Sequence, residues 1–462
     1  MRIFKTFLVL LFLISSRVSP SFAVDVPQSF TFSGSGYGHG IGMSQFGARG
    51  QALEGKSAID ILEYYYTGVT VEPVDDSQNM RVNIGHLLTS VSMKTDTSNG
   101  VVQLFAGDVA GDLAAVPIKT LQAKDLLSFT LLGSNAFPSV KPMTGNVQAL
   151  ASGKIWTIRW SGTRYLTGVN AILSTKVGTA WTAYRYGEIQ IKLVKAAALG
   201  YRIEMTNTVR LHDEYLWGIS EVPSSWPLAA MQAQAIASRT YALNRSGLVK
   251  TACDCDIYGS SKDQTFAGYA KEIERKYGKL WKAAVSTTSA DDSTGYAVLY
   301  QSIPISAYYF SSSWGNTENA IDAWGTEIPY AHSVPDPWSL DVIANPRYAH
   351  WQRDLSQATV SQIFSLPDVL SIRIGTKNSS GSNSLVIATS ITGKTVQLTG
   401  SVFTLRSKLP STYFDVVGAQ IIAAPSTSPA PSTSPTQLPT PTATPVNTPT
   451  PSPTLTELRV RS

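Results

Sequence analysis

A glycine-rich segment near the beginning of the chain combines residue types that a ligand site can use. It runs from Gly38 to Ala48 and has the sequence GHGIGMSQFGA. Its glycines let the backbone adopt positive φ angles and approach another chain or a ligand closely. His39 and Gln45 then become polar groups presented at that surface. The alternative is structural, because glycine clusters also serve tight turns and a single histidine is often a packing residue.

A second motif places an acid at the entrance of a helix. Residues 214–245 have the sequence EYLWGISEVPSSWPLAAMQAQAIASRTYALNR. Glu221 lies in a turn rich in Trp and Pro, where a carboxyl group can donate and accept a proton. Pro227 suits the first turn of the alanine-rich helix that follows. Gln234 and Arg239 inside this helix need polar partners. The alternative for Glu221 is a surface acid at a helix entry.

Two further segments contain groups that bind ligands or metal ions in other proteins. The loop of residues 311–325, SSSWGNTENAIDAWG, offers hydroxyl and amide side chains beside Trp314 and Trp324, which suit sugars as well as ordinary turns. Cys253 and Cys255 stand two positions apart. A disulfide between them would be strained, and a metal site would need further ligands, most plausibly a histidine. We expect a short disulfide or free thiols and assign no metal ligand; a cysteine nucleophile is the third alternative.

The elements that must position these groups predict an α+β fold. Ser57 and Asp60 form a capping-box pattern that begins a short amphipathic helix over residues 56–66. The small side chains of the alanine-rich helix let other elements approach it closely, so we expect it at the centre of a mixed domain with a β-sheet. Short β-favouring runs separated by turn residues predict strands near residues 156–160, 188–194, 295–300, 305–310 and 394–405.

Composition divides the chain into parts. Arg2 and Lys5 precede an apolar run too short to span a membrane, and Ser21-Phe22-Ala23 suits a signal peptidase, so we expect secretion. Residues 424–456 contain ten prolines and no charged residue, so they cannot bury enough apolar surface to fold. We expect a signal peptide (1–23), an N-terminal segment of the catalytic domain (24–70), an inserted mostly-β lobe (71–208), the main part of the catalytic domain (209–420) and a disordered tail (421–462).

Charge and aromatic content limit the class of ligand. The full chain has a net charge of +5, and removing residues 1–23, which contain three basic residues and no acid, leaves +2. Nucleic acid is therefore not an expected partner. Charged residues make up 15% of the chain and aromatic residues 10%, a balance that suits a polar but largely uncharged ligand such as a glycan. No later segment is long and apolar enough to span a membrane.

Taken together, the motifs resemble the sporulation stage II protein D and amidase-enhancer family of bacterial peptidoglycan-active proteins. The similar stretches cover most of residues 34–417: the acid-bearing turn with its helix, ISAYYFSSSWGNTENAIDAWG, GHGIGMSQFGARGQALEGKSAIDILEYYYTG and GKTVQLTGSVFTLRSKLPSTYFDV. The order differs, because the GHGIGMSQ segment usually comes near the end of the domain. Surface termini that lie close together permit such a permutation. Val222 replaces the usual Met, and Trp314 stands where Gly is usual.

The resemblance implies a site and an activity. Family members are lytic transglycosylases acting on peptidoglycan glycan strands, and others were described as amidase enhancers. Glu221 matches the catalytic glutamate. The residues implied or predicted to bind substrate are His39, Ser44, Gln45, Gln234, Arg239, Tyr309, Ser311, Ser313 and Thr317. The expected partners are glycan strands and a cell-wall amidase, the expected place is the bacterial cell envelope, and no cofactor is expected, although some members carry a metal near their site.

One carboxyl group suffices for cleavage without water, because it can protonate the leaving oxygen and then accept the proton of the sugar's own 6-hydroxyl. Hydrolases use a flanking pair of carboxylates instead. Burial beside Ile219, Val222, Pro223 and Trp226 should raise the pKa of Glu221. A neighbouring arginine would lower it, so we predict that Arg239 positions substrate or a loop and does not pair with Glu221. The rival hypotheses are a non-catalytic wall-binding or amidase-enhancing module and, third, a protease or cysteine hydrolase.

Overall fold

The computed structural model describes residues 25–420 and has an α+β fold, as the sequence predicts. The predicted signal peptide, residues 1–23, and the predicted tail, residues 421–462, lie outside the described residues. Within residues 25–420, none of the helices has the length and apolarity needed to cross a membrane.

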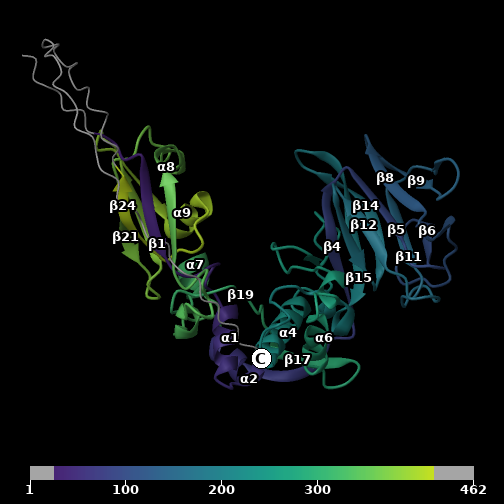
Figure 1. Ribbon diagram of the computed structural model, residues 1–462, viewed down its shortest axis with the longest axis horizontal. Coiled ribbons are helices and arrows are strands. Elements are labelled where there is room, and N and C mark those ends of the chain that lie inside the picture. Colours follow the sequence, from purple (N-terminus) through teal and green to yellow (C-terminus); the bar gives the residue numbers. More distant parts are fainter. Residues whose placement is uncertain (1–24, 421–462) are drawn as a thin grey trace, which may run out of the picture. The chain divides into compact units, whose positions relative to one another are not determined.

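Two sheets, antiparallel except for one edge pair, form most of the segment predicted to be a mostly-β lobe (Figure 1, blue to teal). The seven-stranded sheet has the order β16 (Ile257–Tyr258), β4 (Asn79–Leu88), β15 (Gly200–Arg210), β14 (Glu188–Ala196), β11 (Ile155–Trp160), β6 (Val101–Ala106) and β7 (Lys119–Gln122). The six-stranded sheet has the order β10 (Gln148–Ala149), β9 (Asn135–Lys141), β8 (Leu126–Leu132), β5 (Ser90–Thr95), β12 (Leu173–Val177) and β13 (Ala180–Tyr184). Strands β11 and β14 confirm two of the predicted strands.

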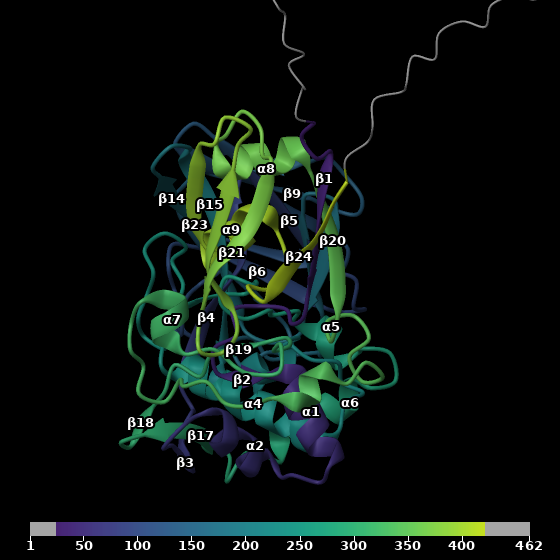
Figure 2. The same cartoon turned by 90° about the vertical axis from the view of Figure 1, so that its left-hand side faces the viewer.

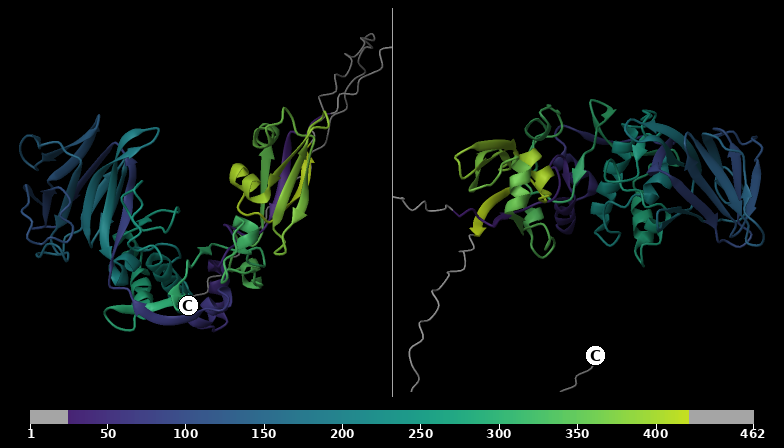
Figure 3. Two further views of the ribbon diagram at one scale, coloured as in Figure 1. Left: turned by 180° about the vertical axis from the view of Figure 1, so that it is seen from behind. Right: turned by 90° about the horizontal axis from the view of Figure 1, so that it is seen from above.

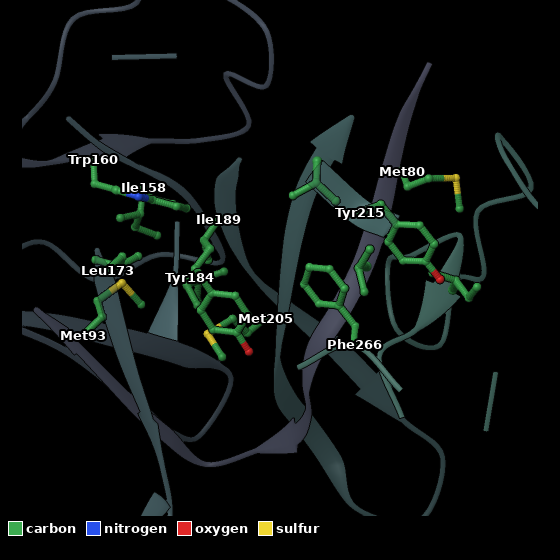
Figure 4. Packing of buried hydrophobic residues seen from close by; sticks show 14 of the residues in the cluster. Met80, Met93, Ile158, Trp160, Leu173, Tyr184, Ile189, Met205, Tyr215 and Phe266 are labelled. Carbon is green, nitrogen blue, oxygen red and sulfur yellow. The ribbon is translucent and has the colours of Figure 1, made fainter. Parts of the chain in front are cut away.

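Alternating side chains of both sheets share one hydrophobic core. Met93 and Leu173 come from the six-stranded sheet, while Ile158 and Ile189 come from the seven-stranded sheet, and all four are fully buried (Figure 4). The core continues into the helices, since Tyr215 belongs to the same cluster. In the seven-stranded sheet, strand β16 pairs in parallel with β4. Residues beyond position 208 therefore contribute a strand to this sheet. The lobe boundaries at 71 and 208 stay predictions.

The alanine-rich segment forms α4 (Leu228–Leu243), with Pro227 at its N-cap. It packs against α1 (Gln45–Leu53), α2 (Ala58–Tyr65), α6 (Gly278–Ser286) and β17 (Thr294–Tyr300) (Figure 1). Ala233, Ala235 and Ala237 are completely buried, and their small side chains permit these close approaches. The helix predicted over 56–66 is α2, whose Ser57–Asp60 capping box is present. Strand β17 lies between β18 (Ile303–Pro304) and β3 (Thr70–Asp75).

The first and last described strands belong to one sheet. Strand β1 (Ser29–Gly34) is hydrogen-bonded on both edges, to β20 (Trp351–Ser356) and β24 (Phe414–Gln420) (Figure 2). Phe30 and Phe32 of β1 pack in a core with Phe403 and Phe414. This core also takes side chains from α8 (Gln357–Phe364), α9 (Gly400–Ser407), β21 (Ser371–Lys377), β22 (Asn383–Thr389) and β23 (Thr395–Thr399). The ribbons of these elements are green to yellow in Figure 3.

Two of the predicted strands are wrong in part. The predicted strand over 394–405 ends at Thr399, because the Thr399 side chain accepts a hydrogen bond from Val402 N and caps α9. Only Tyr309–Phe310 of the run 305–310 forms a strand, β19, which pairs in parallel with β2 (Met43–Ser44). The remaining short elements are η1 (Leu211–Tyr215), α3 (Leu216–Gly218), α5 (Tyr269–Glu272), α7 (Ala320–Trp324) and η2 (Pro337–Leu340).

Candidate functional site

A pocket of about 590 Å³ contains Glu221 and lies among the segments that the sequence singles out. Five residues predicted to be functional line it: Glu221, His39, Gln45, Tyr309 and Ser311. The other lining residues are Tyr37, Gly38, Ser220, Tyr241, Ser261, Lys262, Asp263, Thr265, Tyr308, Phe310 and Trp324. The pocket therefore joins the glycine-rich segment, the acid-bearing turn and the loop around β19.

Glu221 is held by backbone contacts with the segment around Thr265. Ser220 N donates to Thr265 O at 2.8 Å, and Ala267 N donates to Gly218 O at 2.8 Å. Gly218 must be a glycine, because a Cβ there would lie 2.4 Å from the Phe266 ring. Thr265 N then donates to Glu221 Oε1. The carboxyl group is thus fixed in direction at the edge of the pocket, half-buried and accessible.

The environment of Glu221 favours its protonated form. Burial raises the pKa of Glu221, and this effect outweighs the Thr265 hydrogen bonds and the charge of Lys271, which lower it. Lys271 Nζ donates to Val222 O at 2.7 Å, so the nearby cation is fixed to the neighbouring residue's backbone. The expectation of a raised pKa agrees with this direction. The cation that opposes it is Lys271 and not Arg239.

Two tyrosines near Glu221 are joined by one glutamine. Tyr215 OH donates to Gln264 Oε1 at 2.6 Å, and Gln264 Nε2 donates to Tyr309 OH at 3.0 Å. Burial raises the pKa of Tyr215 and of Tyr309, and the Glu221 charge raises both further. Both phenols therefore stay protonated, and the network fixes the Tyr309 ring in the pocket wall.

The structure brings Gln45 to Glu221, as the sequence predicts. Gln45 Nε2 lies 3.4 Å from Glu221 O and donates to Gln234 Oε1 at 3.1 Å. Gln234 Nε2 donates in turn to Ser238 Oγ at 3.1 Å. Gln45 begins α1, whereas Gln234 and Ser238 lie on α4, so this chain of side-chain amides ties both helices to the Glu221 backbone. Gln234 is 1% exposed and does not line the pocket, so it lies in the protein interior behind the residues of the pocket wall.

His39 lies in the pocket wall as a neutral imidazole. Ile41 N donates to His39 Nδ1 at 3.0 Å, so the ring proton is on Nε2. Desolvation lowers the pKa of His39 to about 4, and a hydrogen bond to the Tyr309 backbone opposes this. The ring is exposed to solvent on its pocket side, and its lowered pKa keeps His39 neutral at pH 7. Its ring contacts those of Phe310 and Trp324, with centroids 5.6 and 5.4 Å away.

Backbone pairing positions the glycine-rich segment. Tyr37 and Ser312 form an antiparallel bridge, and Met43 pairs with Tyr309. Gly42 has a φ of 76°, and a Cβ there would lie 2.1 Å from Tyr308 O, so only glycine fits between β2 and the strand beside it. Ser311 O accepts a hydrogen bond from Phe46 N at 2.9 Å, which leaves the half-buried Ser311 side chain in the pocket lining.

Three hydroxyl residues predicted to bind substrate lie behind the pocket wall. Ser44 is fully buried, caps α1 by accepting from Gly47 N at 3.2 Å and contacts Ser339 Oγ at 2.8 Å. Ser313 Oγ accepts from Gly315 N at 3.1 Å, and Thr317 Oγ1 accepts from Val334 N at 2.8 Å. Their positions correct the prediction of direct contact, because their hydroxyl groups are satisfied inside the protein.

Arg239 is also away from the pocket lining. It is fully buried and pairs with Asp76, whose Oδ2 lies 2.6 Å from Arg239 Nε. This buried pair with Asp76 agrees with the prediction that Arg239 does not pair with Glu221. It disagrees with the prediction that Arg239 contacts substrate. Trp314 is likewise 3% exposed, donates to Ser380 O at 3.1 Å and stacks on Tyr413, whereas Trp324 lines the pocket and is 43% exposed.

Cys253 and Cys255 form a disulfide in the structure, one of the two states expected for them. They therefore offer no thiolate to a metal ion. Among residues 25–420, no group of three or more His, Cys, Asp or Glu side chains is arranged to hold a metal. The disulfide closes the turn before β16. The loop that follows β16, residues 259–266, supplies Asp263 and Thr265 to the pocket.

Sequence reasoning missed the residues of this loop. Asp263 accepts hydrogen bonds from Tyr241 OH at 2.9 Å, from Lys250 Nζ at 2.6 Å and from Tyr258 N at 2.9 Å. These contacts shape the loop so that Thr265 N points to Glu221. The run DIYGSSKDQTFAGYA after the cysteines, rich in polar and turn residues, is the signal that marks it.

Comparisons with known proteins match part of the chain, and the matched family model covers Glu221. Residues 200–291 match the family model described as stage II sporulation protein. The chain is 36% identical over 146 residues to stage II sporulation protein D of Bacillus subtilis (strain 168), covering 29% of this chain and 40% of that protein. The corresponding protein of Bacillus amyloliquefaciens is 32% identical over 144 residues, with the same coverage of both chains.

A second kind of relative is the amidase enhancer of Bacillus subtilis (strain 168), 30% identical over 123 residues that cover 25% of this chain and 14% of that protein. The matches thus span less than half the length of each relative. No solved structure is similar enough to match. The matched residues include Glu221, Arg239, the disulfide, Thr265 and Lys271, so this part of the chain is similar to the stage II sporulation protein family.

Proposed function

We propose that this protein is a secreted lytic transglycosylase that cleaves peptidoglycan glycan strands at the bacterial cell envelope and leaves 1,6-anhydro ends. The observation that carries the proposal is Glu221, a carboxyl group of raised pKa, held by Thr265 N in a pocket lined by aromatic and hydroxyl side chains. Aromatic faces with a few fixed polar groups suit a sugar chain.

Glu221 performs both proton transfers in this scheme. Its carboxyl proton passes to the glycosidic oxygen as the bond from that oxygen to C1 of the N-acetylmuramic acid residue breaks. The resulting carboxylate accepts the proton of that residue's 6-hydroxyl, whose oxygen bonds to C1 and closes the anhydro ring. Glu221 is thereby protonated again, and no water is consumed. The raised pKa of Glu221 supports the first step, because it keeps the proton available at higher pH.

The state of the second acid in the pocket supports the single-carboxyl scheme. Asp263 is the other carboxylate that lines the pocket, and its two oxygens accept hydrogen bonds from Tyr241, Lys250 and the Tyr258 backbone. A hydrolase of the usual kind needs a second carboxylate free to act as nucleophile or base. His39 is also unsuited as a base, because its Nδ1 already accepts from Ile41 N.

The experiment is the conservative exchange Glu221→Gln. It should abolish the release of 1,6-anhydro ends from purified glycan strands while binding of the strands persists. Glu72→Gln, at an exposed position of β3 outside the pocket lining, is the matched control and should leave cleavage unchanged. If the unaltered protein releases no anhydro ends from either intact or peptide-stripped strands, the enzyme proposal fails.

The similarity to the amidase enhancer favours a second candidate. In that case the pocket holds a glycan strand while an amidase acts, and Glu221 takes part in binding only. Stimulation of a cell-wall amidase by the Glu221→Gln protein as strong as by the unaltered one, with no anhydro ends from either, would favour it.

A further inference from the structure

A second pocket, of about 650 Å³, adjoins the Glu221 pocket and takes no part in the proposed reaction. Its walls come from β4, β13, α5 and the residues around β16. Lys262 lines both pockets, so the two cavities share a wall. We propose that the second pocket, which we name the Trp181 pocket, is a saccharide subsite that holds the glycan strand beyond the sugars at Glu221. The inference rests on the proposed function.

The Trp181 pocket offers an aromatic surface to a ligand. Trp181 on β13 is 46% exposed, which is unusual for the largest apolar side chain in a protein. Tyr184 and Phe266 line the same pocket, and their largely buried rings stack 6.3 Å apart; Figure 4 shows both side chains. Aromatic rings are large and rigid, so they bind the apolar face of a sugar ring without losing much conformational entropy.

A fixed imidazole supplies polar contacts in the same pocket. His86 Nδ1 lies 2.9 Å from Glu204 Oε2, and this carboxylate can only accept, so His86 donates through Nδ1 and turns Nε2 away from Glu204. Glu204 is 1% exposed and also accepts from Leu87 N at 3.0 Å. Leu87 has a φ of 55°, a strained backbone conformation for a leucine, so this network holds the imidazole at a local cost.

The charges around the Trp181 pocket indicate which saccharide fits it. Its lining contains one lysine, Lys262, and no acidic residue. Lys176 lies 6.0 Å from the centroid of the Trp181 ring, and Lys94, which also pairs with Asp96 at 2.9 Å, lies 5.4 Å from it. A polar strand with some negative charge is therefore favoured over a cationic ligand. Peptide-stripped peptidoglycan glycan fits this description, since the lactyl groups of its muramic acid residues then carry free carboxylates and its rings present apolar faces.

Because the Trp181 pocket adjoins the Glu221 pocket, we assign both pockets to one glycan strand. Lys262 lines both cavities, and its Nζ lies 4.5 Å from the centroid of the Tyr258 ring, which lines the Trp181 pocket. A polymer that passes Lys262 meets Glu221 on one side and Trp181 on the other. The subsite would hold several sugars of one strand and so favour long strands over short ones.

The test compares binding of long and short peptide-stripped glycan strands to the full Glu221→Gln protein by calorimetry. Adding Trp181→Ala should lower the long-to-short affinity ratio by about tenfold, a typical loss for an aromatic side chain that a ligand covers on binding. Trp181→Phe should restore most of it. The matched control is Phe137→Ala on β9 of the same sheet, 40% exposed and outside the pocket, which should leave the ratio unchanged.

The subsite proposal is overturned if the Glu221→Gln protein binds long and short strands equally, if Trp181→Ala leaves the ratio unchanged, or if Phe137→Ala lowers it as much. Tighter binding of a phosphate-containing wall polymer than of glycan, lost with Trp181→Ala, would also overturn it. Cleavage by the unaltered protein is measured separately. A lack of anhydro ends with an intact Trp181 effect would reject the enzyme proposal and keep the subsite.

Discussion

Replacing Asp76 by asparagine separates a structural role of Arg239 from a substrate-binding role. Asp76 and Arg239 are both completely buried, and Asp76 Oδ1 also contacts His212 Nδ1 at 2.5 Å. Arg239 Nη1 donates to Thr288 Oγ1 at 2.9 Å. Burial lowers the pKa of Arg239, and the charge of Asp76 opposes this. Asp76→Asn leaves a guanidinium without its counter-ion inside the protein.

The expected cost follows from this burial. Removing one partner of a buried ion pair costs about 3–5 kcal/mol of the free energy of unfolding, since the other charge stays desolvated. Asp76→Asn should therefore destabilise the protein by about that amount. Arg239→Met added to Asp76→Asn should recover part of the loss, because no lone charge then remains buried. The surface pair Lys377–Asp415, with side chains 42% and 63% exposed, is the control, and Asp415→Asn should cost less than about 1 kcal/mol.

The assay is thermal and denaturant unfolding of the four proteins, with glycan cleavage measured on each while it is folded. A structural Arg239 predicts a large loss of stability and a KM close to that of the unaltered protein. If Asp76→Asn unfolds like the unaltered protein while its KM rises sharply, Arg239 contacts substrate and the buried-pair argument is wrong.

Two further substitutions test the site from other sides. The charge of Lys271 lowers the pKa of Glu221, so Lys271→Met should raise that pKa further. Because the protonated form of Glu221 starts the reaction, the alkaline limb of the pH profile of kcat/KM should move to higher pH. A shift of this limb to lower pH would contradict the assignment. Trp314→Ala should cost about 3–5 kcal/mol of stability, as for other buried aromatic side chains, with little change in KM; a changed KM at unchanged melting temperature would place Trp314 in contact with substrate.

Features fixed by neighbouring residues could be predicted from the sequence. The Ser57–Asp60 pair and Pro227 mark the beginnings of α2 and α4, because capping depends on side chains within one turn. Strands β11 and β14 follow from their runs of β-favouring residues. The motif and the family resemblance also predict that Glu221 lies in the site, and its role stays a prediction.

Partners that are distant in the sequence could not be predicted. Thr265, which holds the Glu221 carboxyl group, lies 44 positions later in the chain, and Asp76 lies 163 positions before Arg239. Nothing local in the sequence specifies such pairings. The hydroxyl groups of Ser44, Ser313 and Thr317 looked suited to sugars for the same reason: a sequence shows that a side chain can form hydrogen bonds, but not whether the protein interior already satisfies them.

The early position of the glycine-rich segment is explained by its backbone pairing. Strand β1 is held on both edges by β20 and β24, and β2 pairs with β19. His39 lies on the connection between β1 and β2, so strands from the last third of the described chain fix both ends of its loop. Gln45 follows β2 directly and reaches Glu221 O. The geometry of this wall therefore depends on which strands β1 and β2 join, and not on where in the chain they come.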